Sequence, residues 1–171
     1  MTKHRPGATG GALVLVMTGL LWAGPARAQT GVGVGDKAPI VTVHDLEGNA
    51  VDLGQWIGKK PVFLEFWATW CELCKELLPR VRAAQAAYGS DVEFIGINVT
   101  VNQSRDRVRR YLETEKPPFR TLYDDEGTST RAYQVPATSY VVIVDRSGKV
   151  AYTGSGGSQD FDRVLQRVSR K

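Results

Sequence analysis

The chain has 171 residues, of which 42% are hydrophobic and 23% charged, with a formal net charge of +4. This length is enough for one domain with its own core and short for two. Three of the 22 basic residues lie before position 29 with no acidic residue among them, which leaves 19 basic against 18 acidic residues in the rest. A nearly neutral remainder argues against a nucleic-acid-binding surface, so we expect no nucleic-acid partner.

The first 28 residues have the pattern of a secretory signal peptide. A basic start, Lys3-His4-Arg5, precedes an apolar run from Ala12 to Ala23, and Ala26-Arg27-Ala28 is a small-x-small cleavage site. The apolar run is short for a membrane span, which needs about 20 residues, and a retained anchor is the alternative. We expect cleavage after Ala28, a single domain over 29–171, and a periplasmic or similarly oxidising location.

The predicted elements begin with a hairpin and a central strand. Residues 30–35 are rich in glycine and are expected to be loose. The turn signal Glu47-Gly48-Asn49 lies between short apolar runs at 41–46 and 51–53, which predicts an N-terminal β-hairpin. The run 62–67 is apolar on both faces apart from one glutamate, which predicts a strand in the middle of a sheet covered by helices.

The rest of the chain continues the alternation of strands and helices. A helix is predicted from Cys71 to about Tyr88, with Pro79 bending it. The remaining predicted elements are a strand at 92–99, a helix at 103–115 capped near Asn102 or Ser104, a hairpin over 139–144 and 149–153, and a last helix capped by Ser158. This order predicts an α/β fold with a mixed central sheet, helices on both faces and an added N-terminal β-hairpin.

The chain contains two cysteines, Cys71 and Cys74, where the central strand gives way to a helix. A zinc site would need about two more ligands, and the mature chain offers a single histidine, His44. A purely structural disulfide across so short a loop would remove little entropy from the unfolded chain. A redox pair is the favoured interpretation, because unpaired N–H groups at a helix N-terminus stabilise a thiolate. We therefore expect no metal and no cofactor beyond a redox-active Cys71–Cys74 disulfide.

In this interpretation Cys71, at the exposed start of the helix, attacks the disulfide of a partner, and Cys74 then resolves the mixed disulfide. Cys74 must lose a proton for this step. Glu65 is the candidate acceptor because it interrupts an apolar strand, and burial raises the pKa of a carboxyl group toward neutral pH. The alternative is that Glu65 lies on the surface of an edge strand.

The segment Phe66–Lys75 resembles the active-site segment of the thioredoxin superfamily, and its Ala68-Thr69 resembles the TlpA/ResA branch of exported, membrane-associated reductases. The resemblance runs from about Asp36 to the C-terminus and implies a thioredoxin-like fold. Glu65 stands where thioredoxin has a buried aspartate. Trp70 is similar to the tryptophan beside the nucleophile of the family, although it could equally belong to the core.

The segment Val135-Pro136-Ala137-Thr138 is similar to the cis-proline loop of the same superfamily. In the family this loop faces the cysteine pair and binds a substrate strand through its backbone. The resemblance thus implies that Val135 and Pro136 bind the partner. An ordinary trans proline before a strand is the alternative.

The resemblance further implies a dithiol reductant of protein disulfides, recharged by a membrane thiol carrier of the DsbD/CcdA type, with cytochrome c maturation as the pathway by analogy. Membrane contact is expected through that redox partner or an uncleaved signal anchor. Glu72-Leu73 departs from the Gly-Pro of thioredoxin, and a carboxylate beside Cys71 favours the disulfide and hence a reductant. A peroxiredoxin-like peroxidase and a copper-delivery module of the same fold are the alternatives. The chain lacks the proline-threonine approach of the first and a histidine after His44 for the second.

Overall fold

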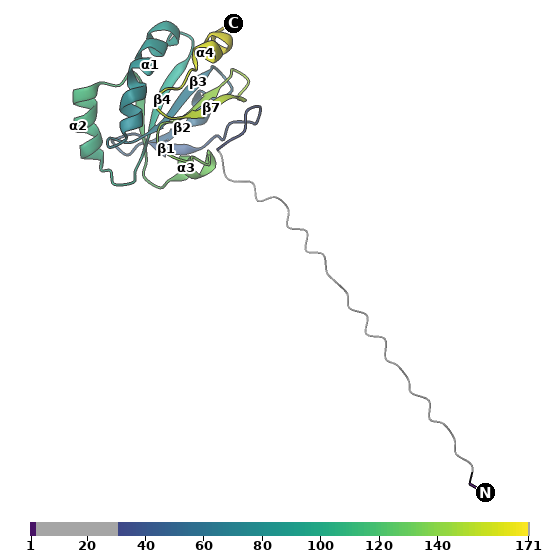
Figure 1. The fold of residues 1–171 in the computed structure, drawn as a ribbon. Coiled ribbons are helices and arrows are strands. Elements are labelled where there is room, and N and C mark those ends of the chain that lie inside the picture. The colour runs from purple at the N-terminus through teal and green to yellow at the C-terminus, as the bar shows by residue number, and fades with distance from the viewer. Residues whose placement is uncertain (3–30, 171) are drawn as a thin grey trace.

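The strands form one mixed sheet in the order β2-β1-β5-β4-β3-β6-β7 (Figure 1). In the computed structural model, which describes residues 1, 2 and 31–170, the strands are β1 (Thr42–His44), β2 (Ala50–Asp52), β3 (Val62–Trp67), β4 (Glu93–Val99), β5 (Arg120–Asp124), β6 (Tyr140–Val144) and β7 (Val150–Ser155). The neighbours β3, β4 and β5 run parallel to one another, and the other pairings are antiparallel. The predicted α/β fold with a mixed sheet and an N-terminal hairpin is confirmed.

Helices cover both faces of this sheet. They are α1 (Glu72–Tyr88), α2 (Arg105–Glu115), the short α3 (Thr128–Ala132) and α4 (Asp162–Ser169), with a 3-10 turn η1 (Leu53–Gln55). The helices α1 and α4 pack on the face that carries Phe63, and α3 and η1 pack on the face that carries Leu64 and Phe66 (Figure 1). Fully burying one such side chain contributes about 1.5–3 kcal/mol. The central strand β3, all of whose residues are buried, is therefore held from both sides.

The signal peptide predicted for residues 1–28 lies, apart from Met1 and Thr2, outside the described residues. The signal peptide and the domain boundary at position 29 accordingly stay predictions. Among the residues that the structure describes, no helix is long and apolar enough to cross a membrane.

Two helix boundaries show how the local sequence acts. Helix α2 is capped by Ser104, whose Oγ accepts a hydrogen bond from the backbone N–H of Arg107 over 3.3 Å, and it ends at a left-handed Lys116. The proposed cap of α4 at Ser158 is wrong, because this helix begins after Phe161 with no side-chain cap. Because the ring of Phe161 is buried in the core, α4 begins about one turn later in the sequence than predicted.

The glycine-rich segment 30–35 is not loose from Gly31 onward, contrary to the prediction. The backbone N–H of Gly35 donates to the carbonyl of Val150 over 2.8 Å, which fastens the segment to β7. A Cβ atom on Gly31 would overlap the side chain of Tyr140, and the φ of Gly31 is +88°. Glycine is needed here for close packing in a left-handed conformation rather than for looseness.

Strand β5 and helix α3 were not predicted. Within β5, two residues, Leu122 and Tyr123, form the fully apolar part, and charged residues stand at both ends. The strand exists because it pairs with β4 on one side and with β1 of the hairpin on the other, where His44 lies opposite Tyr123. These partners are distant in sequence, so the local pattern of five residues carries little signal.

Candidate functional site: a disulfide at a helix N-terminus

The two cysteines form a disulfide at the start of α1, with a Cα–Cα distance of 5.2 Å. Cys71 is the N-cap residue of the helix, and its Sγ accepts a hydrogen bond of 3.0 Å from the backbone N–H of Cys74. This N–H is one of those that a helix leaves without an internal partner at its first turn. The predicted placement of Cys71 at a helix N-terminus is confirmed.

The sulfur atoms lie deeper than predicted. Cys71 is 3% exposed and Cys74 is 5% exposed, so Cys71 is not at an exposed position in the disulfide form. Both pack in a cluster with Trp67, while the neighbouring Trp70 and Leu73 remain 40% and 47% exposed. In the disulfide form the outer sulfur is therefore buried, whereas the two apolar side chains that neighbour the cysteines in sequence are exposed.

Glu65 is buried at 2% exposure in the middle of the sheet, and the alternative of an edge position is wrong. On its face of β3 it lies between Phe63, which packs in the cluster of Leu77, and Trp67, which packs in the cluster of Cys74. Glu65 is therefore beneath the first turns of α1. Burial raises the pKa of this carboxyl group from 4.5 to about 8.

Hydrogen bonds hold the turn between β3 and α1 against the loop after β4. Trp70 Nε1 donates to the carbonyl of Val101 over 2.8 Å, and the backbone N–H of Thr69 donates to Gln103 Oε1 over 3.0 Å. Trp70 is thus a surface residue rather than a core residue. It belongs to the turn between β3 and α1, residues 68–71, which we call the redox turn. Gln103 was not singled out in the sequence, because the fold brings this loop to the turn.

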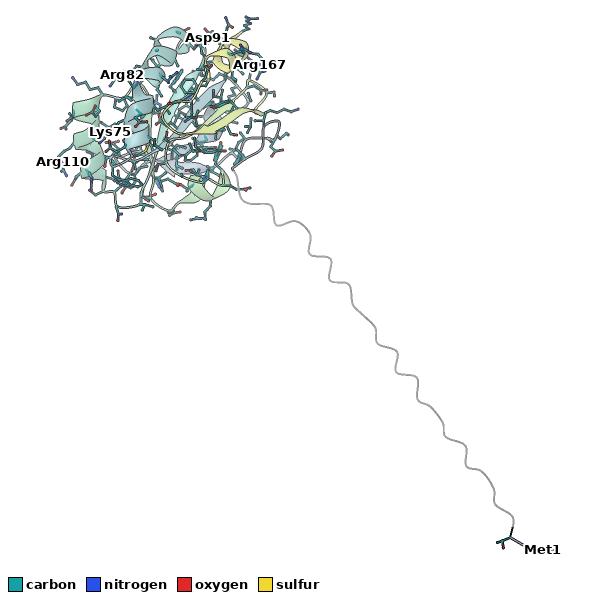
Figure 2. The ribbon with its side chains drawn as sticks, viewed as in Figure 1. Met1, Lys75, Arg82, Asp91, Arg110 and Arg167 are labelled. Carbon is teal, nitrogen blue, oxygen red and sulfur yellow. A yellow bond between two sulfur atoms is a disulfide. The ribbon has the colours of Figure 1, made fainter. Side chains whose placement is uncertain are left out.

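The charge of Glu72, beside Cys71 in sequence, has a partner. Its Oε1 lies 2.7 Å from Nζ of Lys75 in an exposed pair on the first turn of α1. Figure 2 shows Lys75 on α1 on the same side of the molecule as Arg110 of α2. The cation offsets part of the effect that the carboxylate was expected to have on Cys71.

Val135 and Pro136 lie outside the cluster of described residues that contains Cys71 and Cys74, and their binding of the partner stays a prediction. They line an open hollow at the end of α3 together with Gln134, and Val135 packs with the cluster on the opposite face of the sheet. The described residues contain no cis peptide bond, so the predicted cis form of Pro136 is wrong. Trans is the form that X–Pro bonds prefer by about 0.5–1 kcal/mol, and Pro136 is exposed.

Ser139 lies beside the end of β3 that leads into the redox turn. This position of Ser139 was not predicted from the sequence. Its backbone N–H donates to the carbonyl of Phe66 over 2.8 Å, at the end of β3 that leads to Cys71. Ser139 is fully buried and has a φ of +63°, a conformation that is uncommon for serine. The one related signal in the sequence is the glycine-rich segment 154–157. The backbone N–H of Gly156 in this segment donates to the carbonyl of Ser139.

A mixed sheet with helices on both faces and a Cys-x-x-Cys disulfide at the N-terminus of the helix after its central strand defines the class of thioredoxin-like thiol-disulfide oxidoreductases. Comparison with known families agrees with this class. The Redoxin family model matches residues 33–166, and the chain belongs to the Redoxin family.

Individual relatives show the same likeness over most of their length. The chain is 29% identical to the thiol-disulfide oxidoreductase ResA of Geobacillus kaustophilus, over 82% of this chain and 80% of the relative. It is also 29% identical to ResA of Geobacillus thermodenitrificans, over 91% of both chains. The thioredoxin domain of a thiol-disulfide oxidoreductase from Bacteroides vulgatus has the same fold, with a TM-score of 0.70 at 20% identity over 81% of this chain and 99% of that one.

Proposed function

We propose that the chain is a periplasmic dithiol reductant of protein disulfides that works through Cys71 and Cys74. The observation that carries the proposal is the hydrogen bond from the N–H of Cys74 to Sγ of Cys71 at the N-terminus of α1. After reduction, this N–H and the positive end of the helix dipole face the Cys71 sulfur and favour its thiolate. A thiolate is the species that attacks a disulfide.

The reaction transfers two electrons and proceeds in two exchanges. The Cys71 thiolate attacks one sulfur of the partner's disulfide, a mixed disulfide forms, and the other partner sulfur leaves as a thiolate. Cys74 then loses its proton and attacks Cys71 Sγ, which restores the Cys71–Cys74 disulfide and releases the second partner sulfur. The partner is reduced to a dithiol, and the chain is oxidised to the form that the structure shows.

Glu65 is proposed as the proton acceptor for Cys74. It lies beneath the turns of α1 that carry Cys74 and Leu77, and its pKa of about 8 is close to that of an ordinary thiol, about 8.5. Two groups of matched pKa exchange a proton with little change in free energy, which is the condition for efficient general base catalysis. An ordinary surface carboxylate near pKa 4.3 would be a far weaker base.

The electron supply and the setting complete the proposal. A dithiol carrier in the membrane, of the DsbD/CcdA type, would return two electrons to the disulfide after each turnover. Export by the signal peptide with cleavage after Ala28 would place the domain in the periplasm, and the exported cytochromes c are the proposed recipients of the reducing power. The relatives named ResA support the activity and not the recipient.

The test uses the exported domain with each cysteine replaced in turn by serine. Cys71→Ser should abolish insulin disulfide reduction, because the nucleophile is lost. Cys74→Ser should also stop turnover and should accumulate a mixed disulfide with the substrate, visible on a non-reducing gel. Parental rates in either variant would refute the mechanism.

The direction of the reaction is tested by the reduction potential of the pair, measured against glutathione. A potential below the cytosolic glutathione value of about −220 to −260 mV supports a reductant. A strongly oxidising potential, near that of DsbA at about −120 mV, would overturn this assignment. Peroxide turnover faster than insulin reduction would favour the peroxidase alternative instead.

A further inference from the structure

Ser139 is held in its left-handed conformation by hydrogen bonds from two sides. Its N–H donates to Phe66 O at the end of β3, and its Oγ donates to Gly156 O over 3.0 Å. The N–H of Gly156 donates in return to Ser139 O over 3.2 Å. A non-glycine residue in this region is energetically unfavourable and persists where the surroundings determine it.

Gln159 supplies the central part of these surroundings. It is 6% exposed, and its Nε2 donates to Ser139 O over 2.9 Å and to Gly156 O over 2.7 Å. Its Oε1 accepts from the hydroxyl of Tyr152 over 3.3 Å. Both amide hydrogens and the amide oxygen are therefore used inside the protein. A buried amide satisfied in this way holds its partners in one geometry.

The same loop also meets the redox helix. A Cβ atom on Gly157 would overlap the side chain of Glu76, which lies two residues after Cys74 on α1. The loop 155–159 therefore touches both the helix that carries the cysteines and the turn at Ser139. This common support sets the position of the turn relative to the disulfide.

The backbone just before Ser139 is open. Because the N–H of Ser139 donates to Phe66 O, the main chain of Ala137 and Thr138 leaves the sheet at the exit of β3, near Ala68. The backbone N–H of Cys71 donates to Ala68 O over 3.1 Å, so this place adjoins the disulfide. Within the part of the chain that the structure describes, the main-chain groups of Ala137 and Thr138 make no hydrogen bond. Unpaired main-chain groups beside a sheet are a template for an extended segment of another chain.

We propose that Gln159 is a positioning residue for the reaction with protein disulfides: it fixes the turn at Ser139 so that the main chain of Ala137 and Thr138 pairs with an extended segment of the partner beside Cys71. This inference rests on the proposed function. When the amide of Gln159 is absent, Ser139 relaxes from its costly conformation, and each partner has to restore it on binding. A small disulfide that needs no strand pairing is not affected in this way.

The experiment compares Gln159→Met with the parent on two substrates, insulin and 5,5′-dithiobis(2-nitrobenzoate). Methionine keeps the length of the side chain and removes the amide. We expect kcat/KM for insulin to fall at least tenfold, mainly through KM, while the rate with the small disulfide stays within twofold. Equal losses on both substrates, or no selective loss on insulin, overturn the proposal.

Two further variants keep the test decisive. Tyr133→Phe removes the hydroxyl that donates to Pro39 O over 2.8 Å, and it is the control for the loss of a hydrogen bond elsewhere in the fold. It should lower the melting temperature without selective loss on insulin. If Gln159→Met does not fold, Gln159→Asn carries the same comparison, because the shorter side chain withdraws its amide from Ser139 O. Failure of this inference can be told apart from failure of the proposed function, because in the second case the parent itself would not reduce insulin.

Discussion

Replacing Glu65 by glutamine is expected to stabilise the oxidised protein at neutral pH and to flatten its pH dependence. Burial raises the pKa of Glu65 to about 8 in the folded protein, from 4.5. Between these pH values the folded state keeps a proton that the unfolded state releases, so stability falls as the pH rises. The loss begins near pH 4.5 and is complete above about pH 8. At about 1.4 kcal/mol per pKa unit, it amounts to roughly 5 kcal/mol.

Glutamine has no proton to lose, and the difference between the variant and the parent therefore grows with pH. The linkage relation gives an advantage for Glu65→Gln of roughly 1 kcal/mol at pH 5, 3 kcal/mol at pH 7 and 5 kcal/mol at pH 8.5. Guanidinium unfolding without reductant, which keeps the disulfide intact, measures these differences. Glu72→Gln controls for the removal of one carboxylate from the surface of α1.

A difference that stays constant from pH 5 to pH 8.5, or a variant less stable than the parent at pH 8.5, would refute the reasoning about burial. Activity should move in the opposite direction. General base groups typically contribute about 10²–10⁴ in rate, so we expect insulin reduction by Glu65→Gln to slow by at least about tenfold. A variant that is more stable and as fast as the parent would leave Glu65 without a role in the proton transfer.

Two predictions concern close packing at glycines. Gly31→Ala should cost roughly 2–3 kcal/mol in chemical denaturation, because its Cβ overlaps Tyr140 at a φ of +88°, whereas Gly35→Ala, at a φ of +95° with open space, should cost about 1 kcal/mol; equal costs would contradict the overlap. Gly96→Ala should destabilise by roughly 1–3 kcal/mol because its Cβ overlaps the ring of Phe119. Combining it with Phe119→Leu should recover part of that loss, and strict additivity of the two changes would show that they do not interact.

The centre of the site could be predicted because its signals are local. The strand 62–67 is apolar on both faces, and this pattern alone makes it a buried central strand, with Glu65 inside the fold. Cys71 follows this strand and begins a helix with regular apolar spacing, so its place at a helix N-terminus also follows from neighbouring residues. The depth of the sulfurs could not be predicted in this way, because the cluster that buries them includes Val108 and Tyr123, which are distant in sequence.

Within the loop predicted at 135–138, the sequence did not show which residue adjoins the end of β3. Partner binding was assigned to Pro136 because proline is a strong local signal. In the structure this residue lines a hollow at the end of α3. The position beside the redox turn belongs to Ser139, a residue with no distinctive local pattern. It was missed because its neighbours Phe66 and Gln159 are far from it along the chain.

The amino-acid sequence by itself determined the order of the main elements, the redox pair and the burial of Glu65, since periodicity and turn residues act over a few positions. Tertiary structure decided the pairing of β5, the packing of the segment after Gly31 and the turn at Ser139. Each of these depends on hydrogen bonds or contacts between segments distant along the chain. Such contacts form when the sheet assembles. A local sequence pattern does not encode which distant residue will be the contact partner.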